Sequence, residues 1–226
     1  MQTIGGRRMK SVLISTRPKL VEKICHKIGE DETGKAIYEK RIEVRKTAPQ
    51  EVPFKAYIYC TKGKPYLYRV DDDDNFELTN TLRPKVDGYV KDYNEQNGKV
   101  IGEFICDRII CSQAYFDSQG KNHLTNVFPD DIKKTCLDEY DLWDYIAGKA
   151  VKANQMYDGY LWHISDLKIY DKPRELSEFS RPCSYSGLCF SCKRTSFKKD
   201  GNLLCNTKIT RPPQSWCYVE DLGEEE

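Results

Sequence analysis

Residues 99–110 read KVIGEFICDRII, the most apolar stretch of the chain, and this pattern predicts a central strand of a sheet. Shorter runs of apolar and alternating residues on both sides of it predict further strands. These strands are expected at residues 10–15, 38–45, 54–59, 66–70, 159–170 and 214–219. The sequence therefore predicts a core that is built mainly from sheet.

Two short helices are expected among these strands. Pro18 stands where a helix can begin, because its missing N–H has no partner at that position in any helix. Apolar residues recur at helical spacing through residues 18–28, and again through residues 137–146 with Leu142, Trp143 and Ile146 facing inward. About six strands with two short helices favour an α+β fold, a small mixed β-barrel, over a parallel sheet with alternating helices.

The composition limits the partners that the chain can bind. Its 36 Lys and Arg residues balance 35 Asp and Glu residues, so that the net charge is +1. This balance excludes a histone-like binder of the phosphate backbone, and any contact with nucleic acid must be a local patch or a pocket. No run approaches the ~18 apolar residues of a membrane span, and residues 1–10 lack the apolar segment of a signal peptide. We therefore expect a cytoplasmic protein without a membrane partner.

The chain divides into three parts by composition. Residues 1–8 are polar and rich in glycine, and we expect them to be a dispensable lead-in. Residues 9–220 carry the expected strands and helices and form one domain. Residues 221–226 form an acidic tail.

Four of the ten cysteines gather in residues 183–205, and this cluster predicts a metal site. The Cys189-x-x-Cys192 spacing is the common half-site in which two thiolates reach one tetrahedral ion, and Cys183 and Cys205 can complete a four-thiolate shell. The residues between Cys192 and Cys205 are polar and cannot fold on a core of their own, so structural zinc would supply their folding energy. The alternatives are a reduced loop and a redox pair.

Five stretches, taken in order, resemble the ASCH family, a branch of the PUA-like proteins. They are residues 17–19 (RPK), 40–45 (KRIEVR), 98–104 (GKVIGEF), 162–167 (WHISDL) and 211–216 (RPPQSW). The resemblance implies a PUA-like mixed β-barrel with flanking short helices, with the cysteine-rich residues as an insertion. The chain departs from the family signature at Tyr38, where a glycine is usual, and its link at residues 29–39 is longer.

Lys40, Glu43 and Arg45 are the charged residues of the second stretch. On an extended chain Glu43 and Arg45 share one face, while Ile42 and Val44 share the other and can pack on the core. Lys40 joins the charged pair only if the chain bends at the start of the strand. The alternative interpretation is an exposed ion pair on the surface of a strand, which contributes ~0–1 kcal/mol.

The resemblance implies that a cleft near these residues binds RNA or a modified nucleoside. Cations contact phosphate or base acceptors, a carboxylate accepts base N–H groups, and aromatic rings stack on bases. The candidate ligand-binding residues are Arg17, Lys40, Glu43, Arg45, Trp162 and His163. Packing in the core is the alternative for Trp162, and a structural role is the alternative for His163.

A hydrolase acting on nucleic acid, either an amidohydrolase on a modified base or a nuclease, is the alternative function. In the amidohydrolases that the chain resembles, the signature lysine is paired with a nucleophilic threonine, and this chain has Glu43 at that position. Glu43 can still act as a general base with Lys40 beside it, but the hydroxyl nucleophile is lost. A third possibility is an interaction domain that lacks pocket chemistry.

Overall fold

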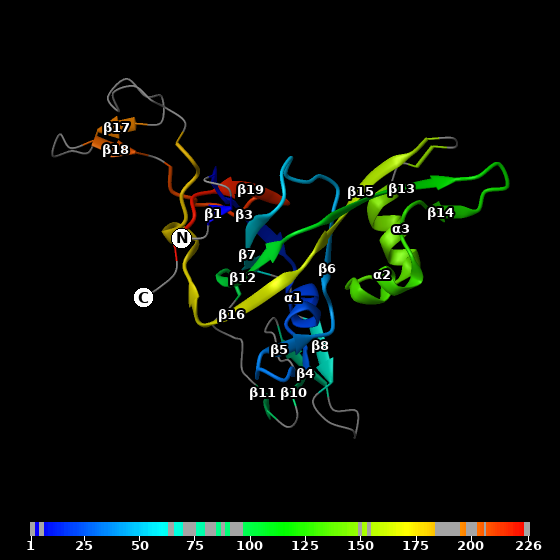
Figure 1. Cartoon of the computed structure of the whole chain (residues 1–226), viewed down its shortest axis with the longest axis horizontal. Coiled ribbons are helices and arrows are strands. Elements are labelled where there is room, and N and C mark those ends of the chain that lie inside the picture. Colours follow the sequence, from blue (N-terminus) through cyan, green and yellow to red (C-terminus); the bar gives the residue numbers. More distant parts are fainter. Residues whose placement is uncertain are drawn as a thin grey trace.

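The computed structural model describes residues 3–4, 7–62, 66–69, 76–79, 85–86, 89–90, 97–148, 151–152, 155–183, 195–197, 203–205 and 207–223. It confirms a mixed α+β fold, because strands hold far more of the described residues than the helices, which are short (Figure 1). No helix in these ranges is long and apolar enough to cross a membrane.

A five-stranded sheet forms the main body, in the order β16-β12-β7-β3-β19. Its strands are β3 (Lys10–Thr16), β7 (Phe54–Cys60), β12 (Val100–Cys106), β16 (Ser165–Arg174) and β19 (Trp216–Val219). The β3–β7 pair is parallel and the other pairs are antiparallel. All seven residues of β7 are buried, including Lys55. The other six are apolar or aromatic, as expected for a strand that is covered on both faces. The predicted strands at residues 10–15 and 54–59 are confirmed.

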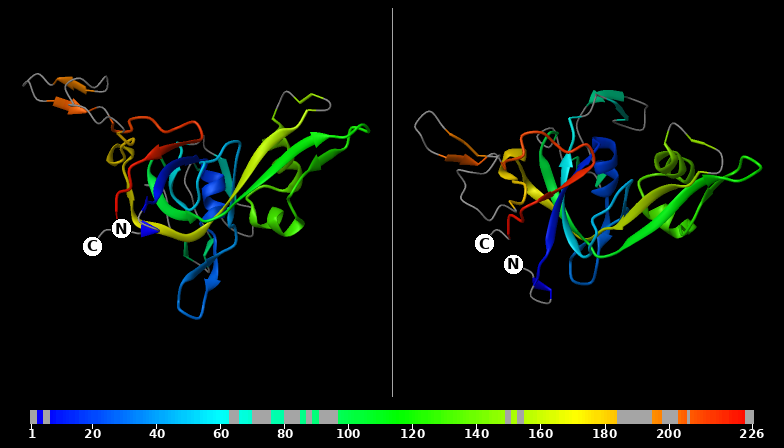
Figure 2. Two further views of the ribbon diagram at one scale, coloured as in Figure 1. Left: turned by 45° about the horizontal axis from the view of Figure 1, so that its top comes forward. Right: turned by 90° about the horizontal axis from the view of Figure 1, so that it is seen from above.

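A four-stranded sheet has the order β14-β13-β15-β6. Its strands are β6 (Ile42–Arg45), β13 (Ile109–Phe116), β14 (Asn122–Leu124) and β15 (Tyr157–His163). Strands β13 and β15 form a long ribbon that extends away from the five-stranded sheet and carries α2 (Pro129–Lys134) and α3 (Glu139–Ala147) with it (Figures 1 and 2). We call this extension, from β13 to β15, the arm.

At two corners the chain passes from one sheet to the other within one or two residues. One corner, at Asp107 and Arg108, joins β12 to β13, and the other, at Ile164, joins β15 to β16. The His163 N–H donates to the Arg108 carbonyl, and the Ile164 N–H donates to the Arg41 carbonyl. The corners divide each of the single strands predicted at residues 99–110 and 159–170 into two strands, one in each sheet. The strand pairings do not join the two sheets into a closed barrel within the described chain.

Helix α1 (Pro18–Ile24) begins where the sequence predicts but ends four residues early. A hairpin of β4 (Lys27–Glu30) and β5 (Ala36–Tyr38) follows it. The Asp31 carboxylate stabilises the turn by accepting hydrogen bonds from the Thr33 and Lys35 N–H groups. Ile28, expected on the buried face of the helix, lies in β4 and is 58% exposed. The strand predicted at residues 38–45 is confirmed only over β6.

The remaining strands form short hairpins, and one 3₁₀ helix, η1 (Leu176–Glu178), follows β16. The hairpins pair β1 (Thr3–Ile4) with β2 (Arg7–Arg8), β8 (Tyr66–Arg69) with β9 (Phe76–Thr79), β10 (Lys85–Val86) with β11 (Tyr89–Val90), and β17 (Thr195–Phe197) with β18 (Leu203–Cys205). The β17–β18 hairpin and the tip of the β13–β14 hairpin lie at opposite ends of the molecule (Figure 2).

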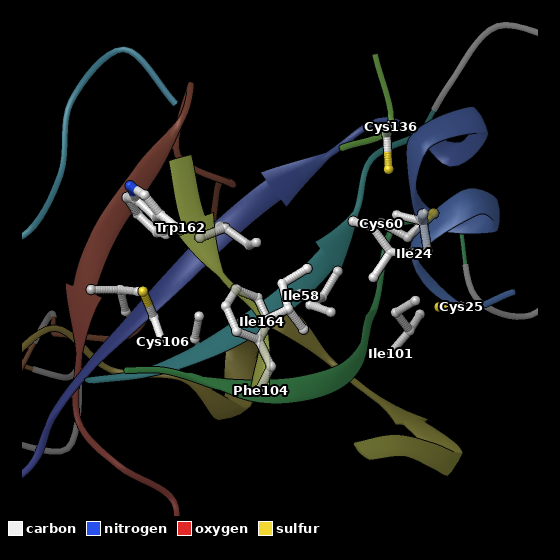
Figure 3. Packing of buried hydrophobic residues seen from close by; sticks show 14 of the residues in the cluster. Ile24, Cys25, Ile58, Cys60, Ile101, Phe104, Cys106, Cys136, Trp162 and Ile164 are labelled. Atoms are coloured by element: carbon white, nitrogen blue, oxygen red, sulfur yellow. The ribbon is translucent and has the colours of Figure 1, made fainter. Parts of the chain in front are cut away.

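Three clusters of buried side chains hold these elements together. The main cluster joins α1 to one face of the five-stranded sheet and includes Trp162 and Ile164 (Figure 3). The second packs α3 on the four-stranded sheet, and Leu142, Trp143 and Ile146 face inward as predicted. The third covers the other face of the five-stranded sheet with Phe179 and Ile209.

Candidate functional site

A pocket of about 490 Å³ lies where α1, β6 and the arm meet. Its walls come from the end of β3, the start of α1, strand β6, the segment after α2, helix α3 and the loop before β19. The lining residues are Ser15, Thr16, Arg17, Lys19, Leu20, Ile42, Glu43, Val44, Arg45, Thr61, Cys136, Leu137, Tyr145, Pro213 and Gln214. Segments far apart in the sequence therefore supply one concave surface.

A buried ion pair forms the polar wall of this pocket. Oε1 of Glu43 lies 2.7 Å from Nη2 of Arg45, and both residues are only 5% exposed. The Arg45 guanidinium also donates to the Ser15 carbonyl (3.0 Å), to the Ser215 carbonyl (3.3 Å) and to Oγ1 of Thr16 (3.0 Å). Contacts with β3 and with the residue before β19 thus hold Arg45 in one orientation. Among the described residues, the Glu43 carboxylate has Arg45 as its one hydrogen-bond partner.

The two faces of β6 carry different chemistry. Ile42 and Val44 pack against α3 in the second cluster, while Glu43 lies opposite Trp162 in the β6–β15 register, on the side of the main cluster. The separation of apolar and charged residues predicted for this strand is confirmed. The alternative interpretation, an exposed ion pair, is wrong. Contacts with β3 and with the loop before β19 bury Glu43 and Arg45.

Burial sets the protonation chemistry of the pocket. It raises the pKa of the Glu43 carboxyl, and the charge and hydrogen bond of Arg45 offset only part of this effect. Burial also raises the pKa of the Cys136 thiol to about 12. Since the thiolate is the nucleophilic form, Cys136 is unsuited to covalent catalysis, whereas Glu43 can exchange a proton with a ligand.

Tyr145 is a pocket residue that the sequence analysis missed. It projects from α3, it is 37% exposed, and Nζ of Lys46 lies 5.9 Å from the centre of its ring. Burial raises the pKa of its hydroxyl, and the charges of Arg45, Glu43 and Arg17 also act on it. The helical pattern around Leu142 and Ile146 identified the buried face of α3, but no sequence signal shows that the flank of the helix meets β6.

The structure brings together three of the six residues that we expected in the cleft: Arg17, Glu43 and Arg45. Lys40 lies in the turn before β6, where its Nζ donates to the Lys133 carbonyl (2.9 Å) and pairs with Glu39 (2.7 Å). Neither of these partners lines the pocket.

Trp162 and His163 occupy other positions. Trp162 is fully buried, with edge-to-face contacts to Phe54 and Trp216 at 5.0 and 5.9 Å between ring centres. Trp162 is therefore a core residue, in agreement with the alternative interpretation of core packing. Nδ1 of His163 lies 2.6 Å from Oδ1 of Asp107 at the β12–β13 corner, a contact that agrees with the structural alternative.

A second and larger hollow, of about 930 Å³, runs along β19. Its cations, Lys10 and Arg181, are balanced by the acidic residues Glu220 and Asp221. Because the charges of this surface cancel and the first pocket holds a buried ion pair, we take the first pocket as the candidate site.

The predicted zinc ligands lie only partly within the described residues. Cys183 is an exposed free thiol, and Cys205 ends β18, where its Cα is opposite that of Thr195. Cys189 and Cys192 lie outside the described residues. In the described chain no group of three or more His, Cys, Asp or Glu side chains is placed to hold a metal ion.

Comparison of the chain with protein families, with curated proteins and with solved structures finds no match. The function of the pocket must therefore be inferred from its chemistry.

Proposed function

We propose that the chain is a PUA-like domain of the ASCH type that binds RNA or a modified nucleoside in the pocket beside Glu43 and Arg45. The observation that carries the proposal is a buried, oriented carboxylate–guanidinium pair on the wall of a pocket. Burying a charged pair has a large desolvation cost. Here the buried pair lines a pocket that a ligand can enter. The order of the five ASCH-like stretches supports the same assignment.

The size and the lining of the pocket suit a nucleobase. Its volume of about 490 Å³ lies within the ~300–1,000 Å³ of ordinary ligand pockets. The Glu43 carboxylate accepts N–H groups from a base edge, and with its raised pKa it can also donate a proton to a ring nitrogen. Tyr145 offers an aromatic face for stacking, and base stacking on such rings tolerates different bases.

Hydrolysis of a nucleic-acid substrate is the second candidate function, and the raised pKa of Glu43 favours it. A carboxyl group whose pKa is moved toward neutrality is suited to act as a general base for water. In this reaction Glu43 activates a water molecule, which attacks an acylated base or RNA.

Calorimetry with a library of nucleosides and short RNAs, together with chromatography of acylated nucleosides and RNA after incubation, tests both functions. For a binding protein, Glu43→Gln weakens base recognition about tenfold, because one charge-assisted hydrogen bond is lost, and no substrate turns over. For a hydrolase, the same change leaves the affinity nearly intact and abolishes turnover. The absence of both binding and turnover would reject the pocket and favour an interaction domain.

We also propose structural zinc in residues 183–205, held by Cys183, Cys189, Cys192 and Cys205. The β17–β18 hairpin supports this proposal, since it returns Cys205 to a position opposite Thr195, which is three residues after Cys192. A cytoplasmic location is part of the proposal, because Cys25, Cys60, Cys106 and Cys136 are all free thiols, as is usual in a reducing compartment.

A further inference from the structure

The candidate pocket has more positive charge than its buried pair requires. Glu43 is already paired with Arg45, and Arg17 and Lys19 line the same pocket with exposed side chains. The Arg17 carbonyl accepts hydrogen bonds from the Leu20 and Val21 N–H groups, but the side chains of Arg17 and Lys19 have no ion-pair or hydrogen-bond partner within the described ranges of the chain. The described lining therefore carries two cationic groups that no acidic lining residue neutralises.

An aromatic ring from a different element completes the arrangement. Tyr145 is contributed by α3, whereas Arg17 and Lys19 come from the start of α1, and these helices lie on either side of β6 (Figure 1). A ligand in this pocket meets an aromatic face from one helix, two cations from the other and the oriented carboxylate of Glu43 from the strand between them.

These groups differ in what they recognise. Guanidinium and ammonium groups at a rim bind phosphate oxygens, whereas an uncharged sugar offers such cations no counter-charge. An aromatic face binds a planar ring of any base, and a buried carboxylate reads base N–H groups. A nucleoside would use the ring and the carboxylate and would leave both cations without a partner.

We propose that the ligand is a nucleotide rather than a free nucleoside, with its base on Tyr145 and Glu43 and its phosphate at Arg17 and Lys19. This inference rests on the proposed function of the pocket and selects between its two ligand classes. A free mononucleotide and a nucleotide within single-stranded RNA share this chemistry.

Matched pairs of ligands test the contribution of the phosphate. The probes are nucleosides, unmodified and modified at the base, and the 5′-monophosphates of the same nucleosides, measured by calorimetry at low salt. We expect each monophosphate that binds to do so at least about tenfold more tightly than its nucleoside, and the Arg17→Ala/Lys19→Ala variant to remove this difference. Lys121→Ala is the control, because Lys121 is an exposed lysine in the distant turn of the β13–β14 hairpin.

The salt dependence of RNA binding tests whether Arg17 and Lys19 contact phosphates of a single strand. With a short single-stranded RNA, each phosphate contact contributes a slope of about −0.7 to log K against log salt. Each of the Arg17→Ala and Lys19→Ala changes should therefore reduce the slope by about 0.7, and Lys121→Ala should not change it. Tight mononucleotide binding without binding of RNA identifies the free nucleotide as the ligand.

Tyr145 is tested by a conservative pair of variants. Tyr145→Leu removes the aromatic face and should weaken nucleotide binding about tenfold to a hundredfold, while Tyr145→Phe should stay within about threefold of the wild type. Thermal melting of each variant shows whether it is folded.

Three results would overturn the inference. If nucleosides bind as tightly as their monophosphates, the pocket recognises the base alone and the proposed function stands without the phosphate. If Tyr145→Leu binds nucleotides like the wild type, the base does not stack on Tyr145. Failure of every nucleoside, nucleotide and RNA to bind rejects the proposed function itself, and the inference with it.

Discussion

Glu43 and Trp162 face each other across the antiparallel pair of β6 and β15. A carboxylate therefore projects from the same face of the sheet as the largest buried side chain of the main cluster. On the opposite face, Val44 pairs with Leu161 and packs against α3. One four-residue strand thus separates the polar pocket from the apolar interior of the arm.

Removing the guanidinium from the pocket is expected to be costly. Arg45→Ala leaves the Glu43 carboxylate buried without its partner and removes the hydrogen bonds to Ser15, Thr16 and Ser215. Loss of one member of a buried pair lowers the free energy of unfolding by about 3–5 kcal/mol, which urea denaturation measures. A double variant, Glu43→Leu with Arg45→Met, should recover part of this loss, because no charge is then left buried. An Arg45→Ala protein within 1 kcal/mol of the wild type would show that water reaches the pair freely.

Asp221 is expected to attach the end of the chain to the main sheet. Its carboxylate accepts a hydrogen bond from the Tyr57 hydroxyl and lies 3.2 Å from Nζ of Lys55, which is itself buried. The Leu222 N–H donates to the same hydroxyl. The packed fold therefore includes two residues of the stretch that we expected to be a tail. Asp221→Asn should lower the free energy of unfolding at pH 7 by about 1.5–3 kcal/mol, since a hydrogen bond to a charged group is lost. Glu220→Gln is the matched control on the neighbouring exposed residue.

The pH dependence of the Asp221 contribution has a definite sign. Burial acts to raise the pKa of Asp221, but the Tyr57 hydrogen bond, Lys55 and the Gly223 N–H outweigh it and hold the pKa below its usual value. A group whose pKa is lower in the folded state stabilises the protein above its unfolded pKa of about 3.9 and loses this effect as the pH falls through the folded value. The difference between wild type and Asp221→Asn should therefore shrink between pH 5 and pH 2. A difference that grows in acid would contradict the assignment.

Strands β12 and β16 approach each other closely at Gly102, and a larger residue there is expected to destabilise the sheet. A Cβ on Gly102 would lie 2.5 Å from the Lys168 carbonyl oxygen and 3.1 Å from Cδ1 of Ile169. The backbone carbonyl cannot move without disturbing the sheet, so Gly102→Ala should lower the free energy of unfolding by about 1–3 kcal/mol. Gly29→Ala is the control, because nothing lies within 4 Å of a Cβ at that position. Equal effects of the two changes in urea denaturation would mean that β16 shifts without cost.

The sequence predicted the elements whose signal is local and missed those that depend on tertiary contacts. Strand β7 and helix α3 were predictable because a short run of mostly apolar and aromatic residues and a helical apolar spacing each have one simple structural explanation. The corner at Ile164 was not predictable, since an apolar alternation looks the same whether the strand stays in one sheet or enters another.

The candidate site shows the same limit. The faces of β6 followed from the period of two residues, but the burial of Glu43 and Arg45 depends on carbonyls of Ser15 and Ser215, which are distant in sequence. Tyr145 enters the pocket only because α3 packs beside β6. The periodicity of a sequence shows which face of an element a residue lies on. Which other element packs against that face depends on the whole fold.

The last prediction concerns zinc. Protein purified under reducing conditions should contain about one zinc per chain, as one four-thiolate shell requires, and elemental analysis measures this ratio. Cys189→Ser should release the metal, because the Cys189-x-x-Cys192 half-site is lost. Cys111→Ser should keep it, because Cys111 is an exposed thiol of β13 in the arm and has no part in the proposed shell. Since metal binding supplies folding energy, a chelator should make residues 183–205 sensitive to proteases and leave the two main sheets resistant. Freshly reduced protein without metal, or equal metal loss in both variants, would reject the zinc site and leave a reduced loop or a redox pair as the explanation of the cysteine cluster.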